Sequence, residues 1–100
     1  MNDLAFHPES QQELRDAARY YERQQAGLGK AFRLRIETAL EAITKNPNRF
    51  ALWRRTAVRV ALVRRFPYAI YFLIDDSDCV LIIAISHARQ RPEYWQHRLR

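Results

Sequence analysis

The hydrophobic residues of this chain change their spacing near residue 46, and that change constrains the fold more than any other feature. Before it, apolar residues recur every three or four positions, which is typical of helices that are buried on one side. After it, β-branched and aromatic residues form short runs separated by polar links, which is typical of strands. One hundred residues make about one domain. We therefore expect a single α+β domain over residues 1–100.

Two helices are predicted in the first part of the chain. Pro8 suits the first turn of a helix, and one apolar stripe extends this helix to about Gln24. Gly27 and Gly29 are the only glycines, and both lie where the first helix must stop. A second helix follows and ends before Asn46. The segment is therefore predicted to be an αα-hairpin.

The rest of the chain predicts a sheet for this hairpin to cover. A short strand at 4–7 opens the chain, and four more strands are expected at Phe50–Trp53, Ala57–Arg64, Tyr68–Ile74 and Cys79–Ser86. Pro92 is expected to open a short final helix that carries Tyr94 and Trp95. The predicted fold is α+β: an N-terminal strand and αα-hairpin packed on a twisted antiparallel sheet, with a short C-terminal helix.

The last two predicted strands are apolar on both faces. In the strand 68–74, for example, Ile70 and Phe72 alternate with Tyr71 and Leu73. The αα-hairpin can cover only one of these faces. The other face needs the C-terminal helix, or another polypeptide, to shield it from water. This is the physical argument for a protein partner.

The net charge of +6 lies entirely in the second half of the chain. Residues 1–45 carry seven basic and seven acidic residues, whereas residues 46–100 carry ten basic and four acidic ones. A field of one sign attracts an acidic partner and speeds the encounter with it. Nucleic acid, an acidic protein and an anionic membrane all fit that description.

Several kinds of site are not expected. A single cysteine, Cys79, makes no intramolecular disulfide, and the three scattered histidines lack the spacing of a zinc site. The turn 75–78 is acidic but lacks the glycine and distal glutamate of a calcium loop. Ser86 and His87 are adjacent on a strand end, so they point to opposite faces and cannot form a nucleophile–base pair. We expect no cofactor and no metal.

No membrane association is expected either. The apolar runs are far shorter than the roughly 20 residues that span a bilayer, and residues 1–6 lack the features of a signal peptide. We therefore expect a cytoplasmic protein.

A polar belt is predicted at one edge of the sheet. Arg64 and Arg65 precede the strand 68–74, and the segment His87–Arg91 follows the last strand. In an antiparallel pair joined by a short turn, the start of one strand lies beside the end of the next. The two segments should therefore meet, and their arginines could bind phosphate or an acidic protein surface.

At these residues the chain resembles the RelE/ParE superfamily, the toxins of bacterial type II toxin–antitoxin modules, which are also called plasmid stabilisation proteins. The segments that carry the resemblance are Arg64–Tyr71, Ser86–Trp95, Ala17–Tyr21, Gly27–Gly29 and Asn46–Pro47. The resemblance implies growth inhibition and a cognate acidic antitoxin, which is partly disordered when free and folds on the toxin.

The superfamily offers two mechanisms. RelE-like members cleave messenger RNA in the ribosome with basic residues and a C-terminal tyrosine, whereas ParE-like members poison DNA gyrase by protein contact. Where the RelE-like pattern has an arginine after the central tyrosine, this chain has Ala69, and Trp95 takes the place of the C-terminal tyrosine. These departures favour the ParE-like branch. A ribosome-dependent nuclease and a non-toxic binding module remain alternatives.

The resemblance and the belt together give the expected site residues. Residues expected to bind the target are Arg59, Arg64, Arg65, His87, Arg89, Arg91, Tyr94 and Trp95. If the protein were a nuclease, the catalytic candidates would be Arg64, Arg65, His87 and Arg89. Residues expected to bind the antitoxin are Leu14, Tyr21, Phe32, Tyr71 and Leu73.

Overall fold

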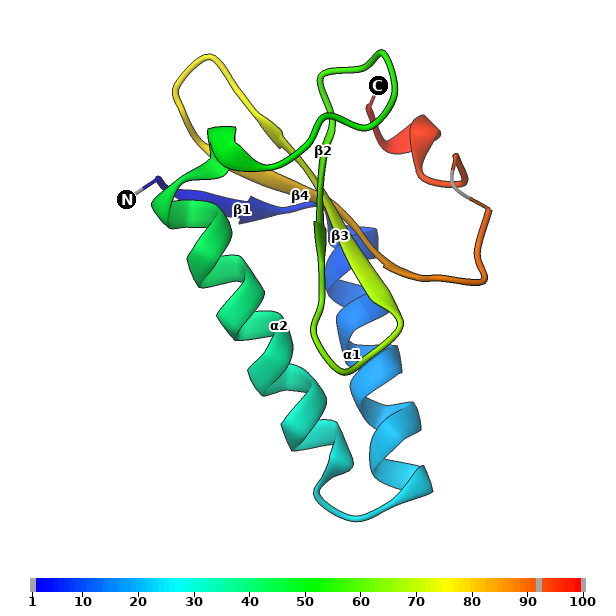
Figure 1. The fold of residues 1–100 in the computed structure, drawn as a ribbon. Coiled ribbons are helices and arrows are strands. Elements are labelled where there is room, and N and C mark those ends of the chain that lie inside the picture. Colours follow the sequence, from blue (N-terminus) through cyan, green and yellow to red (C-terminus); the bar gives the residue numbers. More distant parts are fainter. Residues whose placement is uncertain (1, 92, 100) are drawn as a thin grey trace.

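The structure, a computed structural model, describes residues 2–91 and 93–99 and places a helical hairpin against one face of a four-stranded sheet (Figure 1). The elements in chain order are β1 (Leu4–Phe6), α1 (Pro8–Gln24), α2 (Leu28–Lys45), the 3-10 turn η1 (Pro47–Arg49), β2 (Arg59–Leu62), β3 (Tyr68–Ile74), β4 (Val80–His87) and the 3-10 turn η2 (Gln96–Leu99). The α+β class and both predicted helices are confirmed.

The start of α1 is fixed by its own residues. Pro8 occupies the first helical position, where its missing N–H is not needed. The Nδ1 atom of His7 accepts a hydrogen bond of 3.1 Å from the backbone N–H of Glu9. Glu9 also places a negative charge near the positive end of the helix dipole.

The glycines make the tight turn between α1 and α2. Gly27 has a φ angle of +89°, a left-handed conformation that other residues adopt at a cost. At Gly29 a β-carbon would lie 2.5 Å from the backbone oxygen of Ala18. A side chain at position 29 would therefore push the two helices apart.

The sheet is mixed, with the strand order β1–β4–β3–β2. β2, β3 and β4 pair antiparallel, as expected, and β1 joins β4 in parallel as an edge strand. A bulge at Tyr71/Phe72 shifts the register between β3 and β4. Because of this shift, Ile83 and Ala84 both pack on the face away from the helices.

The prediction of a strand at residues 50–53 is wrong. This segment makes only an isolated bridge, from Leu52 to Arg59 at the start of β2, and Leu52 itself belongs to no strand. The Arg59 guanidinium donates a hydrogen bond of 2.6 Å to the Phe50 carbonyl, and the chain turns at Arg54, whose φ angle is 52°. These contacts hold the segment at the outer edge of β2, but the turn leaves no length for a strand.

The face of the sheet under the helices carries the main core. Phe32 and Ile36 of α2 are buried against Ile70 and Phe72 of β3 and against Ile82 of β4. Phe32 and Tyr21 also stack with Phe66 at centroid distances of 5.2 and 5.0 Å. The hairpin and the loop before β3 are therefore parts of one core.

The C-terminal segment covers a large part of the opposite face. Trp95 is fully buried with Val58 and Ile83, and its ring lies 5.0 Å from Trp53 and 4.9 Å from Tyr71. In Figure 1 this red segment lies beside the green loop that precedes β2. The chain therefore shields this part of the sheet itself, which was one of the two expected solutions. The cover is incomplete, because Leu62 of β2 remains 80% exposed.

A buried ion pair ties this segment to α1. Arg98 donates hydrogen bonds of 2.9 and 3.0 Å to the two carboxylate oxygens of Glu13, and one of 3.0 Å to the Ile83 carbonyl. Glu13 also accepts from the Ile85 N–H and the Tyr94 hydroxyl. The pair thus satisfies backbone groups of β4 at Ile83 and Ile85, beyond the point where β1 stops pairing with β4.

The expected C-terminal helix is a shorter element. Pro92, which was expected to open it, lies outside the described residues. Residues 93–95 form turns, and only Gln96–Leu99 makes a 3-10 turn. No helix in the described part of the chain is long and apolar enough to cross a membrane.

Candidate target-binding surface

The two basic segments meet at one edge of the sheet, as the strand pairing predicted. Tyr68 of β3 pairs with His87 of β4, and the Ala88 N–H donates to the Pro67 carbonyl at 2.8 Å. The rings of Tyr68 and His87 lie edge to face at 5.2 Å. This edge carries a set of residues that we name the arginine rim: Arg64, Arg65, His87, Arg89 and Arg91.

The backbone around the rim is held by local hydrogen bonds. Arg65 adopts a left-handed conformation with a φ angle of 72°, and the Val63 N–H donates to the Tyr68 carbonyl across the turn. His87 Nδ1 accepts from the Arg89 N–H at 3.0 Å, and the His87 N–H donates to Gln90 Oε1 at 3.1 Å. The loops therefore present their side chains from a defined backbone.

The arginines of the rim are available to a partner. Arg64, Arg65, Arg89 and Arg91 are all exposed. Over residues 2–91 and 93–99, none of their guanidinium groups makes an ion pair or a hydrogen bond. A guanidinium group offers five donors that suit carboxylates and phosphates, so the rim can bind either kind of anion.

A row of three paired residues, Leu62, Ala69 and Ser86, crosses the sheet beside the rim. Leu62 pairs with Ala69, and Ala69 pairs with Ser86. The C-terminal segment leaves the β2 end of this row uncovered, since Leu62 is largely exposed, whereas Ser86 at the β4 end is buried. The row offers a shallow apolar contact next to the arginines.

The tyrosines near the rim are poorly suited to act as bases. Burial, with a smaller contribution from nearby Tyr21, raises the pKa of Tyr68 to about 12. Burial and the hydrogen bond to Glu13 also raise the pKa of Tyr94 well above its ordinary value. The Tyr94 hydroxyl already donates to Glu13 at 2.6 Å. Both side chains therefore stay protonated at neutral pH.

Three of the expected target-binding residues make contacts within the chain. Trp95 is fully buried on the face of the sheet away from the helices and cannot contact a partner in this conformation. Arg59 donates to the carbonyls of Asn48 and Phe50, so its guanidinium group holds the segment before β2. Tyr94 is half-buried behind the ion pair of Glu13. In this conformation these contacts occupy the three side chains within the chain itself, and their role in target binding stays a prediction.

The residues expected to bind an antitoxin are mostly part of the core. Phe32 is fully buried under the sheet, so another chain cannot contact it in this conformation, and its role in antitoxin binding stays a prediction. Leu14 and Tyr21 are half-buried against the same core. Tyr71 and Leu73 are half-buried beside Trp95. An apolar stripe in the sequence does not distinguish a contact within the chain from a contact with another chain.

No sequence pattern indicates the Glu13–Arg98 pair. Glu13 reads as a favourable acidic residue near the start of a helix, and Arg98 reads as one of several basic residues near the end of the chain. The two are 85 residues apart.

In the described residues no group of three histidine, cysteine or acidic side chains could hold a metal ion.

Comparison with protein families decides the identity. The family model "ParE toxin of type II toxin-antitoxin system, parDE" matches residues 4–92. This chain belongs to the ParE toxin family. The match spans both helices, the whole sheet and the rim of this family member. A comparison with curated protein sequences found no significant match.

Solved structures support the fold of this ParE family member. The chromosomal ParDE system from P. aeruginosa contains a similar chain, with a TM-score of 0.76 and 17% identity over 89% of this chain and 98% of that one. The intact E. coli RelBE complex gives a TM-score of 0.67 and 17% identity over 90% and 100%. The isolated E. coli RelE toxin gives 0.67 and 17% over 97% and 95%. At this level of identity the likeness shows the common fold of the superfamily.

Proposed function

We propose that this ParE family member stops growth by binding a protein of the DNA-processing machinery, with DNA gyrase as the first candidate. The arginine rim and the adjacent uncovered row of Leu62 and Ala69 form the contact. The rim provides charge for steering and orientation, and the row provides apolar area. Antitoxin binding neutralises the protein.

The observation that carries this proposal is the state of the two C-terminal aromatic residues. Cleavage of RNA needs a base to take the proton of the attacking 2′-hydroxyl, and a donor for the leaving group. Trp95 is buried, and the Tyr94 hydroxyl donates to Glu13. Ala69, in the middle of the row, cannot stabilise a phosphate. The surface is thus better suited to hold an anionic partner than to react with it.

Two substitutions in the rim test this role. Arg64→Ala and Arg89→Ala are expected to weaken growth arrest by at least about tenfold when combined, since each removes an exposed donor to the target. Both arginines are exposed, so the free energy of unfolding should change by less than about 0.5 kcal/mol. Titrated induction measures the first effect and urea unfolding the second. Arg55→Ala, at an exposed position in the turn before β2, is the matched control. Unfolding of either rim variant would mean that its arginine has a structural role.

The antitoxin is proposed to bind in the groove between α2 and β2. Small apolar residues, Ala39, Ala42 and Ala61, line this groove together with Phe50, and Arg35, Arg49 and Arg64 surround them. An acidic amphipathic segment fits both the apolar floor and the basic margin. Arg64 belongs to this groove and to the rim. A bound antitoxin would therefore cover part of the target contact, which explains neutralisation.

Ala42→Glu tests the groove without touching the rim. The new carboxylate would narrow the groove and repel an acidic segment, so the affinity for the antitoxin should fall at least about tenfold. Growth arrest by the free toxin should persist. Ala31→Glu, on the same helix but outside the groove, is the control. Calorimetric titration with the purified antitoxin measures the affinity. Equal affinities for the two variants would place the antitoxin elsewhere.

The alternative of a ribosome-dependent nuclease is supported by one feature of the rim. His87 lies between the exposed arginines, where it could protonate a leaving group while Arg64, Arg65 and Arg89 hold the phosphate. Primer extension on messenger RNA from translating ribosomes separates the two functions. If messenger RNA is cleaved in the ribosomal A site and the cleavage is lost in His87→Ala, the protein is a ribosome-dependent nuclease and the proposal of gyrase binding is wrong.

A further inference from the structure

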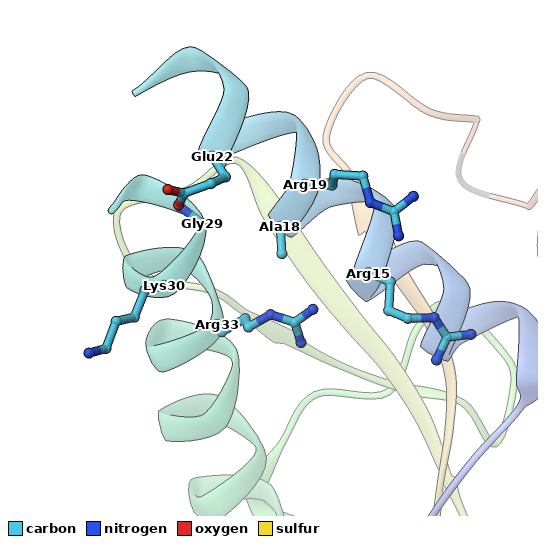
Figure 2. A pocket seen from close by; sticks show the side chains of 7 residues that line it. All are labelled: Arg15, Ala18, Arg19, Glu22, Gly29, Lys30 and Arg33. Carbon is cyan, nitrogen blue, oxygen red and sulfur yellow. The ribbon is translucent and has the colours of Figure 1, made fainter. Parts of the chain in front are cut away.

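A second basic surface lies on the outer side of the αα-hairpin, away from the rim. It is a groove of about 390 Å³ between α1 and α2 (Figure 2). Arg15 and Arg19 extend from α1, and Lys30 and Arg33 extend from α2. Residues 1–45 have no net charge, so composition alone conceals this concentration of cations on one face.

The only acidic residue of the groove is already bound. One carboxylate oxygen of Glu22 accepts from the Gly27 N–H at 2.9 Å, and the other accepts from the Gly29 N–H at 3.0 Å. Glu22 thus satisfies the N-terminus of α2, and Figure 2 shows its side chain turned toward Gly29. Its charge is directed at the backbone and away from the cations of the groove.

The four cations of the groove have no acidic partner within residues 2–91 and 93–99. Arg15 donates to the neutral amide of Gln12, and all four side chains are exposed. Arg15 and Arg19 are four residues apart on one helix, and Lys30 and Arg33 are three apart on the other. Like charges at these spacings repel each other and weaken a helix. The arrangement is unfavourable for the isolated protein and becomes favourable when an anion lies between the rows.

The lining of the groove indicates what kind of anion fits. Among the residues that the structure describes, the apolar lining consists of Ala18 and Gly29, and both are small and buried. An acidic peptide that folds on binding must bury apolar area to offset the entropy that it loses, and this groove offers little. A nucleic acid backbone is already ordered and binds through release of its counterions. Three of the four cations are arginines, which bind phosphate through two hydrogen bonds.

We propose that this groove binds the phosphate backbone of a nucleic acid, without reading its sequence. No aromatic side chain lines the groove to stack on a base. The contact is therefore one that positions the protein on nucleic acid. It is separate from the rim and does not depend on which protein the rim binds.

Fluorescence anisotropy with the purified full chain tests the proposal. The probes are a labelled duplex DNA of random sequence and a duplex RNA of the same length, each titrated between about 50 and 200 mM salt. Four phosphate contacts predict a slope of about −3.6 for the logarithm of affinity against the logarithm of salt concentration. Binding to either duplex supports the proposal and identifies the source of the phosphates.

The double variant Arg19→Gln/Arg33→Gln removes one cation from each wall of the groove. Its salt slope should fall to about −1.8, and its affinity near 0.1 M salt should fall by about tenfold or more. Arg23→Gln/Arg55→Gln has the same net charge but changes exposed arginines outside the groove, so it should retain the slope of the original protein. Circular dichroism verifies that both variants are folded.

Three results would overturn the proposal: no binding to either duplex, the same loss in both double variants, or displacement of the DNA by polyglutamate at a lower concentration of charge than by unlabelled duplex. The second would show diffuse attraction by net charge, and the third would favour an acidic protein. Because the anisotropy assay contains no gyrase, a negative result there does not contradict the proposal that the protein binds gyrase. A negative result in the gyrase assay likewise does not contradict the proposal that this groove binds nucleic acid.

Discussion

Glu13→Ala should lower the free energy of unfolding by about 3–5 kcal/mol, because it leaves the buried Arg98 guanidinium with only the exposed Glu9 carboxylate as a counter-ion. The Arg98 side chain is only 5% exposed, and Glu13 accepts two hydrogen bonds from its guanidinium. The same substitution removes the partners of the Ile85 N–H and the Tyr94 hydroxyl. Small domains have only about 5–15 kcal/mol of stability. Urea denaturation should therefore show a markedly lower midpoint.

Two controls show whether the loss comes from the unpaired charge. Glu9→Gln affects an exposed carboxylate that lies 3.5 Å from Arg98 Nε, so it should lower the urea midpoint far less than Glu13→Ala does. The double variant Glu13→Leu/Arg98→Met replaces both charges by apolar groups and should recover most of the stability. If the double variant were as unstable as Glu13→Ala, the hydrogen bonds to β4 would matter more than the charge.

Trp95→Ala should lower the free energy of unfolding by about 3–5 kcal/mol, because it removes the largest fully buried side chain, which lies on the face of the sheet away from the helices. The rings of Trp53 and Tyr71 would lose their packing partner, and Val58 and Ile83 would become accessible to water. Exposed apolar area of this kind promotes association. Thermal unfolding and light scattering measure the two effects.

Trp95→Phe is the matched control for this prediction. Trp95 Nε1 is buried and has no hydrogen-bond partner among the described residues, so its removal sacrifices no polar contact. We expect a cost of about 1–2 kcal/mol and no association. If Trp95→Ala were as stable as the original protein, the C-terminal segment would not be the cover of this face in solution.

The local parts of the fold could be predicted from the sequence. α1 begins at Pro8 and ends at Gln24 as expected, because helix signals lie within a few residues of the ends that they set. β3 has the predicted bounds for the same reason. The segment 50–53 was predicted wrongly, because its apolar residues match a strand while its backbone is held by Arg59. That contact depends on the tertiary structure.

The site was predicted in part. Pairing of antiparallel strands correctly brought the start of β3, which follows Arg64 and Arg65, beside His87 at the end of β4. The role of Trp95 was missed, because an aromatic residue near the end of a chain looks the same whether it covers its own sheet or binds a partner. The same ambiguity affects Phe32. Burial of one side chain depends on residues distant in sequence, and a single sequence does not show them.

A DNA supercoiling assay with purified gyrase tests the central claim most directly. The claim is that the exposed arginine rim binds a DNA-processing protein and does not cleave RNA. The toxin should inhibit supercoiling at concentrations near that of gyrase, and the combined Arg64→Ala/Arg89→Ala variant, although folded, should inhibit far more weakly. Full supercoiling activity in the presence of excess toxin, or equal inhibition by the folded rim variant, would contradict the account.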